Sequence, residues 1–133
     1  GLHGLVAAAS DQGSATWGCL STLITGADGI IIGTGNQNTI DIVNGCLTAG
    51  IAAKICYDLD FNGYTDWFLP SKDELGLMYT KLKQAGYGGF SLVNYWSSSE
   101  SSNDFANKQN FSTGSAGTST KDVSYNVRAA RAF

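Results

Sequence analysis

Charged side chains are scarce in this 133-residue sequence, which has eight Lys and Arg and eleven Asp and Glu, together 14% of the residues. This share is about half of that in an average globular domain. The formal net charge is −3, and this acidic balance argues against a general nucleic-acid-binding protein. Polarity comes instead from Ser, Thr, Asn and 17 Gly, a mixture typical of turn-rich β or α+β structure with long surface loops.

Long apolar runs are also missing, since no stretch approaches the ~20 residues of a membrane-spanning helix. We therefore expect no membrane insertion. Pro70 is the only proline, so Gly, Asn and Asp must shape the loops. Hydrophobic residues still make up 43% of the chain, which is enough for the core of one domain over residues 1–133. Because Gly1 is not a natural start, we expect a piece of a longer protein.

Three cysteines leave at least one thiol unpaired within the chain. Cys56 lies on the apolar face of a helical pattern at 51–59, which predicts a buried, inert thiol. Cys19 lies in a turn-like region and Cys46 between helical segments, so these two are the better disulfide pair, and such a bond would indicate export. Cys46–Cys56 is the alternative pairing.

The order of predicted elements, short strands followed by helices and then an antiparallel run, is typical of the α+β class. We expect a strand at 3–10, a loop anchored by Trp17, a helix capped by Asn38 or Thr39, and a second helical segment at 51–59. In the third helix Ser71 and Glu74 form a Ser-x-x-Glu capping box. Its buried stripe is predicted to consist of Leu75, Met78 and Leu82.

A period-two pattern follows Phe90 and predicts strands at 90–96, 106–114 and 122–133. A hairpin is expected at 111–122, with Gly114 and Gly117 at its bend. The serine-rich stretch at 97–104 lies between aromatic residues, so we predict ordered turns there rather than a flexible linker.

Motifs for catalysis are weak. His3 is the only histidine, so a Ser–His–Asp triad would have to use it. The sequence contains neither a GxSxG elbow nor a phosphate-binding loop, and no Cys/His cluster has zinc spacing. We therefore predict a protein that is not an enzyme and has no cofactor.

Residues 58–66 match the first part of an EF-hand calcium loop. The possible ligands are Asp58, Asp60, Asn62 and Asp66. Leu69 occupies the twelfth position, where such a loop needs a bidentate Glu, so we favour an ordinary turn after a helix and expect only weak calcium binding.

Three segments carry a resemblance to a known family. They are HGLVAAASDQ at 3–12, GYTDWFLPSKDELGLMY at 63–79, and YWSSSE, QNFSTG and SYNVRAARAF within 95–133. In this order and spacing they resemble the family of bacterial surface domains that includes the C-terminal domain of the Legionella collagen-like adhesin. The resemblance covers nearly the whole chain.

The resemblance implies an extracellular or cell-surface domain with a C-type-lectin-like fold: a small twisted antiparallel sheet, two or three helices and long ordered loops. It implies a homotrimer at the end of a collagen-like stalk that binds sulfated glycosaminoglycans and promotes host attachment and biofilm formation. The Glu-Pro-Asn and Trp-Asn-Asp motifs of calcium-dependent lectins are absent, so calcium-mediated sugar binding does not carry over. Family members have a further strand before the segment at 3–12, which leaves the partner of the first strand open.

A sulfated polyanion requires a basic surface although this chain is acidic, so its cations must cluster, and a trimer would replicate them around an axis. The predicted glycan-binding residues are Lys81, Lys83, Lys108, Lys121, Arg128 and Arg131, of which the two arginines are expected to be tied into the sheet. Two other functions stay open. One is a trimerisation cap without glycan binding, and the other is a carbohydrate-active or calcium-binding domain that uses Asp58, Asp60 and Asp66.

Overall fold

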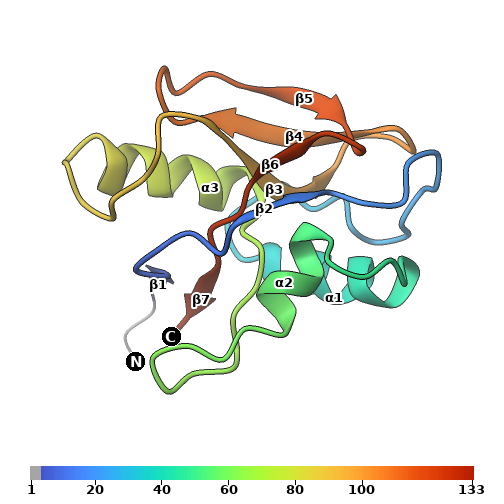
Figure 1. Cartoon of the computed structure of the whole chain (residues 1–133), viewed down its shortest axis with the longest axis horizontal. Helices are drawn as coiled ribbons and strands as arrows, with labels where there is room; N and C mark the ends of the chain where they lie inside the picture. The colour runs from blue at the N-terminus through green and yellow to red at the C-terminus, as the bar shows by residue number, and fades with distance from the viewer. Residues whose placement is uncertain (1–3) are drawn as a thin grey trace.

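The computed structural model of the chain describes residues 4–133 and has the predicted α+β architecture (Figure 1). Three α-helices pack against a five-stranded sheet, and a separate two-stranded sheet completes the fold. The elements in chain order are β1 (Leu5–Ala7), β2 (Ser14–Thr16), α1 (Gly35–Gly45), α2 (Ala52–Tyr57), α3 (Lys72–Met78), the π-helical segment η1 (Tyr79–Lys83), β3 (Asn94–Glu100), β4 (Phe105–Asn110), β5 (Ala116–Thr120), β6 (Ser124–Asn126) and β7 (Ala130–Ala132).

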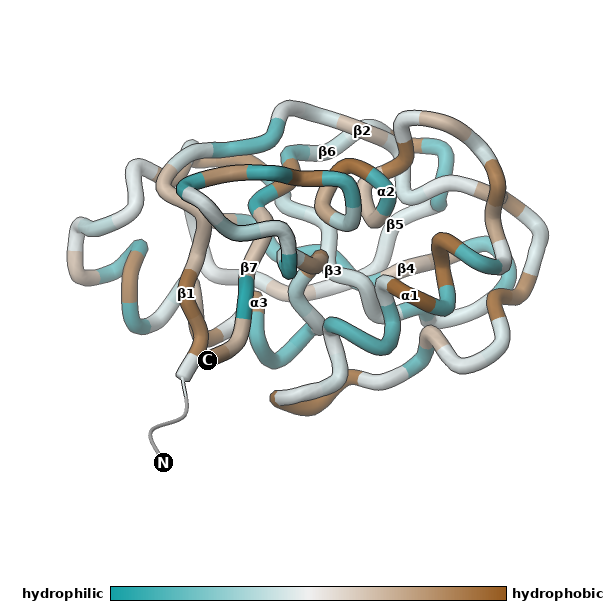
Figure 2. The backbone as a smooth tube through the Cα atoms, turned by 90° about the horizontal axis from the view of Figure 1, so that it is seen from below, coloured by the Kyte–Doolittle hydropathy of each residue, from teal (hydrophilic) through white to brown (hydrophobic). Residues whose placement is uncertain are grey.

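The larger sheet has the strand order β2-β6-β3-β4-β5. Its neighbours are antiparallel except β3 and β6, which pair in parallel through Tyr95 and Asn126. The second sheet consists of β1 and β7, and β7 also forms an antiparallel bridge from Ala130 to Phe68. Strands close to the two chain ends therefore pair with each other, at the end of the molecule where Figure 2 shows the apolar residues of β1 beside β7.

The serine-rich stretch differs from the prediction. Ser97–Ser99 do not lie in turns but continue β3, the central strand, and all three are at most 1% exposed. Burial of a hydroxyl is tolerated only when it is hydrogen-bonded. Ser97 donates to the carbonyl of Asn107 at 2.7 Å, and Ser99 donates to the carbonyl of Gly29 at 2.7 Å. The predicted turn follows later, where the hydroxyl of Ser102 accepts from two backbone amides.

The first helix begins earlier than predicted, at Gly35 rather than after Asn38 or Thr39. Both predicted caps are buried inside α1. The Asn38 amide donates to the carbonyl of Gly29, and the Thr39 hydroxyl accepts from the amide of Leu69 at 3.0 Å. Side chains that usually cap a helix are used here for contacts between the helix and neighbouring loops.

The third helix agrees with its prediction. The Ser71 hydroxyl accepts from the amide of Glu74, and the Glu74 carboxylate accepts from the amide of Ser71 at 2.8 Å, which completes the capping box. Leu75 and Met78 are buried as expected, whereas Leu82, the third residue of the predicted stripe, is only half-buried and lies in the π-helical segment η1. The Glu74 carboxylate also accepts from the amides of Gly33 and Gly35, so the cap fixes the start of α1 as well.

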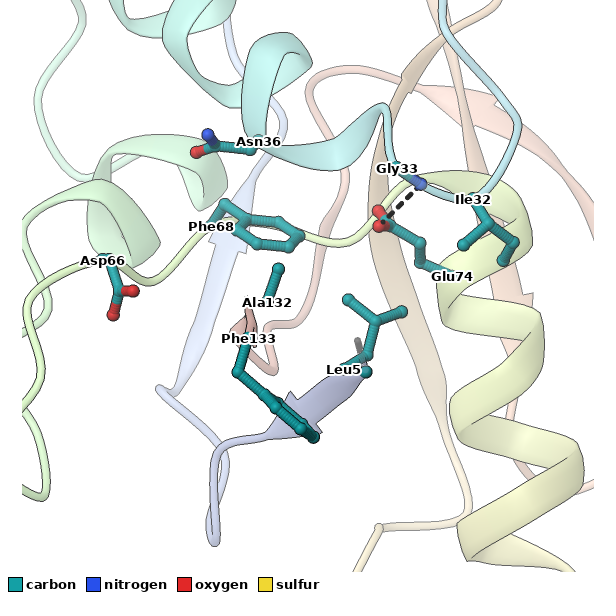
Figure 3. A pocket seen from close by; sticks show the side chains of 10 residues that line it. Leu5, Ile32, Gly33, Asn36, Asp66, Phe68, Glu74, Ala132 and Phe133 are labelled. Carbon is teal, nitrogen blue, oxygen red and sulfur yellow. Dashed lines mark hydrogen bonds between the residues drawn. The ribbon is translucent and has the colours of Figure 1, made fainter. Parts of the chain in front are cut away.

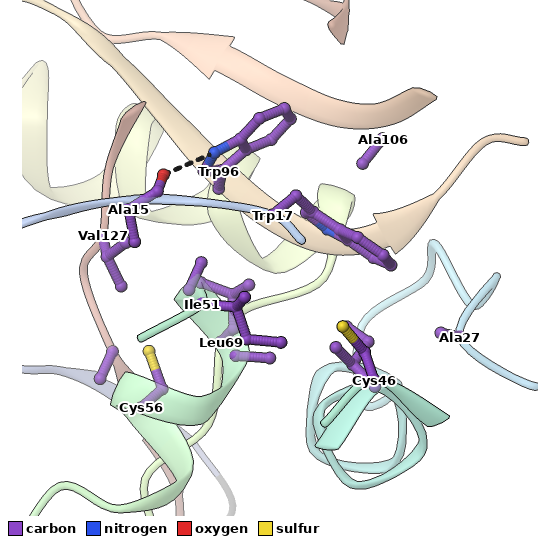
Figure 4. Close-up of a cluster of buried hydrophobic side chains, with 14 of the residues drawn as sticks. Ala15, Trp17, Ala27, Cys46, Ile51, Cys56, Leu69, Trp96, Ala106 and Val127 are labelled. Carbon is purple, nitrogen blue, oxygen red and sulfur yellow. Dashed lines mark hydrogen bonds between the residues drawn. The ribbon is translucent and has the colours of Figure 1, made fainter. Parts of the chain in front are cut away.

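Trp17 and Trp96 are fully buried in the larger of two apolar clusters, between the sheet and helices α1 and α2 (Figure 4). The cluster includes Cys46, which forms the predicted disulfide with Cys19. Cys56 is unpaired and fully buried, and burial raises the pKa of its thiol well above the ordinary value. The prediction of one disulfide and one inert thiol is confirmed, and the Cys46–Cys56 alternative is wrong.

The predicted hairpin is formed by β4 and β5, which pair in regular antiparallel register. Gly114 lies in the bend with φ of 82°, a conformation that favours glycine. Gly117, also predicted at the bend, lies inside β5 opposite Lys108. Of the strand predicted at 3–10, β1 covers Leu5–Ala7; residues 8–10 are not in a strand, and residue 3 lies outside the described residues.

Candidate functional site

The cationic side chains fall into two groups. Four of the eight Lys and Arg form ion pairs with carboxylates: Lys54 with Asp58, Lys121 with Glu100, Arg128 with Asp11 and Arg131 with Asp66. Within residues 4–133 the other four have no ion pair, and these are Lys72, Lys81, Lys83 and Lys108. They occur only on α3, η1 and β4, elements that follow or contact one another.

Lys121 was predicted to bind glycan, and its burial contradicts this. Its side chain is 0% exposed, and Nζ lies 2.6 Å from Oε2 of Glu100. The ammonium also donates to the carbonyl of Thr22 and lies 4.7 Å from the ring centroid of Trp17. Two of its three N–H donors are used inside the protein and the side chain has no exposed surface, so Lys121 cannot contact an external polyanion.

Arg128 is buried in the same way and is removed from the predicted site. Its Nε donates to Asp11 at 2.7 Å, its Nη1 donates to the carbonyls of Ala8 and Gly88, and the guanidinium stacks on the ring of Phe90. The arginine is held in place as expected, but by loops rather than within a sheet: it lies in the segment 127–129 between β6 and β7 and fixes that segment to the loop after η1 and to the residues after β1.

Arg131 pairs with Asp66 through Nε at 2.8 Å and Nη2 at 3.1 Å, and its guanidinium lies 3.6 Å from the ring centroid of Tyr64. The hydrogen bond from Arg131 lowers the pKa of the Asp66 carboxyl below its ordinary value. A bidentate pair of this kind fixes the orientation of the guanidinium and neutralises its charge. Arg131 is therefore a link between β7 and the loop after α2 rather than a free cation.

The remaining lysines do not all share one face. Lys81 and Lys83 lie on η1, where Lys83 is 5.9 Å from the ring centroid of Tyr79. Gln109 of β4 faces α3, because its Oε1 is 3.8 Å from the position that a Cβ on Gly76 would take. Side chains alternate along a strand, so Lys108 lies on the opposite face of the sheet, where it donates to Asn94 at 3.2 Å. Within one copy the structure does not join Lys108 to the lysines of the helix.

Lys72 was not among the predicted site residues. It is the first residue of α3 and half-buried, and it has no carboxylate partner among the described residues. The sequence could have indicated Lys72 as a candidate, because it follows the cap Ser71 in the segment that also carries Lys81 and Lys83. The capping pattern, however, predicts only the start of the helix there.

The predicted calcium loop is occupied by other interactions. Asp58 pairs with Lys54 and Asp66 pairs with Arg131. Asn62 and Gly63 adopt positive φ in a tight turn between Phe61 and Tyr64, which exchange two backbone hydrogen bonds at 3.0 Å. Among residues 4–133 no three His, Cys, Asp or Glu side chains are grouped to hold a metal ion. His3, the only histidine considered for catalysis, lies outside the described residues.

We expect millimolar calcium to leave the thermal unfolding midpoint unchanged, because two of the four possible ligands are already in ion pairs. Differential scanning calorimetry with and without calcium measures this, with a magnesium sample as the control for ionic strength. A calcium-specific rise of the midpoint that disappears in Asp60→Ala would contradict this expectation and revive the metal-binding alternative.

Two adjoining hollows lie at the end of the molecule that carries β1 and β7. The larger, about 550 Å³, is bordered by β1, β7 and the loop before α1, and Leu5, Phe68 and Phe133 face it (Figure 3). The smaller, about 290 Å³, lies between β1 and the α3–η1 helix and is lined by Lys81. Ile32 borders both and is 49% exposed. Neither hollow contains a nucleophile paired with a base.

No protein-family model matches the sequence, and no curated protein matches it either. Within the described part of the chain, no helix is both long and apolar enough to cross a bilayer. The disulfide is consistent with an oxidising extracellular or periplasmic environment, since such bonds are rare in reducing compartments.

Proposed function

We propose that this chain is an extracellular or cell-surface adhesin domain that binds sulfated glycosaminoglycans and is not an enzyme. We further propose that it has a C-type-lectin-like fold and forms a homotrimer at the end of a collagen-like stalk. Its role would be in host attachment and biofilm formation. The observation that carries the proposal is the segregation of the cations. Every lysine that has no carboxylate partner among residues 4–133 belongs to α3–η1 or to the adjacent strand β4.

This segregation offsets the acidic composition. The charge of −3 is a total over the chain, whereas a polyanion responds to the local potential within about 8–10 Å, the Debye length near physiological salt. On α3–η1 the nearby carboxylates are Asp73, which is exposed, and Glu74, whose charge is engaged by three backbone amides. Lys72, Lys81 and Lys83 therefore dominate the field of the helix.

A trimer fits the position of Lys108. On one copy this lysine lies on the sheet face opposite the helix lysines, so a glycan chain reaches both groups only around the edge of the sheet or across a boundary between copies. Replication about an axis also multiplies weak contacts into useful avidity. The oligomeric state is measured by sedimentation equilibrium of the full chain.

Charge reversal on the helix tests the site. In Lys81→Glu/Lys83→Glu we expect heparin affinity to fall at least about tenfold, because one charge-assisted contact to a sulfate contributes roughly 1.5–3 kcal/mol. Retention of the native protein on immobilised heparin should also decrease with salt. Both are measured by surface plasmon resonance over a series of salt concentrations.

The single reversal Lys81→Glu should also weaken binding, and its matched control is Lys54→Glu, because both change the net charge by −2 and Lys54 on α2 already pairs with Asp58. Lys54→Glu should retain native affinity. Equal weakening by this control would mean that only total charge matters, and undiminished binding by the double variant would remove the helix from the site. A tight trimer that does not bind heparin at any salt concentration would favour the trimerisation cap instead.

A further inference from the structure

Strand β1 has one paired edge and one open edge. Gly4 and Phe133 exchange two backbone hydrogen bonds at 3.0 Å, and the amide of Ala8 donates to the carbonyl of Ala129. In an antiparallel ladder such pairs alternate with residues whose backbone groups point the other way. The amides and carbonyls of Leu5 and Ala7 therefore point away from β7, and they have no backbone partner among the described residues.

β7 cannot offer a second open edge at the same place, because its Ala130 already exchanges two backbone hydrogen bonds with Phe68, at 2.8 and 2.9 Å. The small sheet thus ends at β1. An edge strand with free donors and acceptors is a template for pairing with another extended chain. Natural proteins usually protect such an edge with charged side chains or proline, but β1 has the sequence Leu-Val-Ala and Val6 is 38% exposed.

A groove runs along this strand for its whole length. It is lined on one side by Gly4–Ala7 and on the other by α3–η1, with a volume of about 290 Å³. Its walls are apolar: Ile32 and Leu77 are 49% and 37% exposed, and Met78 and Leu82 also border the groove. An added strand would direct every second side chain to this apolar surface.

Among the described residues that line the groove, the charged side chains are Lys81 and Glu74, and the unpaired charge is the positive one. Lys81 lines the groove and has no carboxylate partner among residues 4–133. Glu74 also borders it, but this carboxylate is 1% exposed and accepts from the amides of Gly33, Gly35 and Ser71. An acidic group on the incoming chain would therefore meet an unneutralised ammonium.

We propose that the open edge of β1 and this groove bind an extended peptide segment of a partner protein by strand addition. The segment carries aliphatic side chains at alternate positions and an acidic residue that reaches Lys81. Its backbone pairs with Leu5 and Ala7, and its aliphatic side chains cover Ile32 and Leu77. Main-chain pairing supplies affinity in this mode of recognition and the side-chain pockets supply specificity. The proposal does not rest on glycan binding, but both ligands would use Lys81 and would compete for it.

The test uses the full chain and a synthetic probe, an acetylated and amidated peptide of alternating valine and threonine that ends in aspartate. We expect NMR chemical-shift changes at Leu5, Ala7, Ile32 and Lys81, and amide exchange at Leu5 and Ala7 slowed about tenfold at saturation. The same peptide with N-methyl groups on alternate backbone nitrogens should not bind, since it cannot pair with a strand edge.

Three variants make the test specific. Ala7→Pro removes one outward amide and is compatible with an edge strand, and it should abolish the shifts. Leu77→Glu, on the exposed side of α3, places a like charge against the aspartate and should do the same without touching β1. Lys81→Met should weaken binding about two- to fivefold, the range of an exposed ion pair.

Equal binding of the N-methylated peptide, or shifts that the Ala7→Pro and Leu77→Glu variants leave unchanged, would overturn the proposal. So would slow exchange of the Leu5 and Ala7 amides that is already present without peptide and depends on protein concentration, because a second copy would then occupy the edge.

Discussion

Lys121→Met is expected to lower the free energy of unfolding by about 3–5 kcal/mol, because it leaves a buried carboxylate without its counter-charge. Glu100 has a side-chain exposure of only 2%, and its Oε2 accepts both from Lys121 and from the amide of Ile24 at 2.9 Å. Methionine fills most of the space of the lysine side chain, so packing against Trp17 is largely retained. The loss therefore measures the uncompensated charge more than a cavity.

Urea unfolding at neutral pH, followed by tryptophan fluorescence, gives this free energy. The double variant Lys121→Met/Glu100→Gln should recover most of the loss, since the glutamine carbonyl still accepts from Ile24 and no buried charge remains. Lys108→Met is the control at a half-buried lysine that has no carboxylate partner in the described structure, and it should change stability by about 0.5 kcal/mol or less. A single-variant loss below about 1 kcal/mol would mean that water reaches the pair.

The local features of the third helix could be predicted because their signals lie within a few residues. Ser71 and Glu74 are three positions apart, and the apolar stripe of Leu75 and Met78 follows one helical turn. Helix capping and periodicity depend on neighbours in sequence rather than on the rest of the fold. The same is true of the Gly114 bend, which needs only a residue that tolerates positive φ.

The serine-rich strand could not be predicted, because its reason is tertiary. Serine favours turns when its hydroxyl bonds to the local backbone, and the sequence alone offers no other partner. In the structure the partners of Ser97 and Ser99 come from β4 and from the loop at Gly29. Central position in the sheet, rather than propensity, decides the conformation of Ser97–Ser99.

The candidate site was predictable only in part for the same reason. A lysine that binds a ligand and a lysine that neutralises a buried carboxylate are identical in sequence. Lys121 pairs with Glu100, and strands β4 and β5 separate the two residues in the sequence. Arg128 pairs with Asp11, which is 117 positions earlier in the chain. Lys81 and Lys83 remain candidates because the helix supplies no carboxylate that pairs with them. The sequence therefore gives the number of cationic residues, but only the fold tells which of them neutralise buried carboxylates and which are available to a ligand.

Replacement of Cys19 and Cys46 together by alanine is expected to lower the free energy of unfolding by about 3.5 kcal/mol. The two cysteines are 27 positions apart, and a cross-link over a loop of this length restricts the unfolded chain by roughly that free energy. In the folded state the bond joins the loop after Trp17 to the end of α1, two segments that frame the larger core cluster. The loss of stability is measured by urea unfolding without reductant.

Reductant supplies the matched control for this pair. Dithiothreitol should destabilise the native protein by the same amount and leave the double variant unchanged. The alternative explanation is a disulfide that involves Cys56. The structure argues against it, because this thiol is fully buried and burial raises its pKa. A thiol reagent should therefore find no reactive cysteine in the oxidised native protein and one after unfolding. Sensitivity of the double variant to dithiothreitol would require a bond that involves Cys56, most simply between two copies, and would contradict the assignment of this thiol to the core.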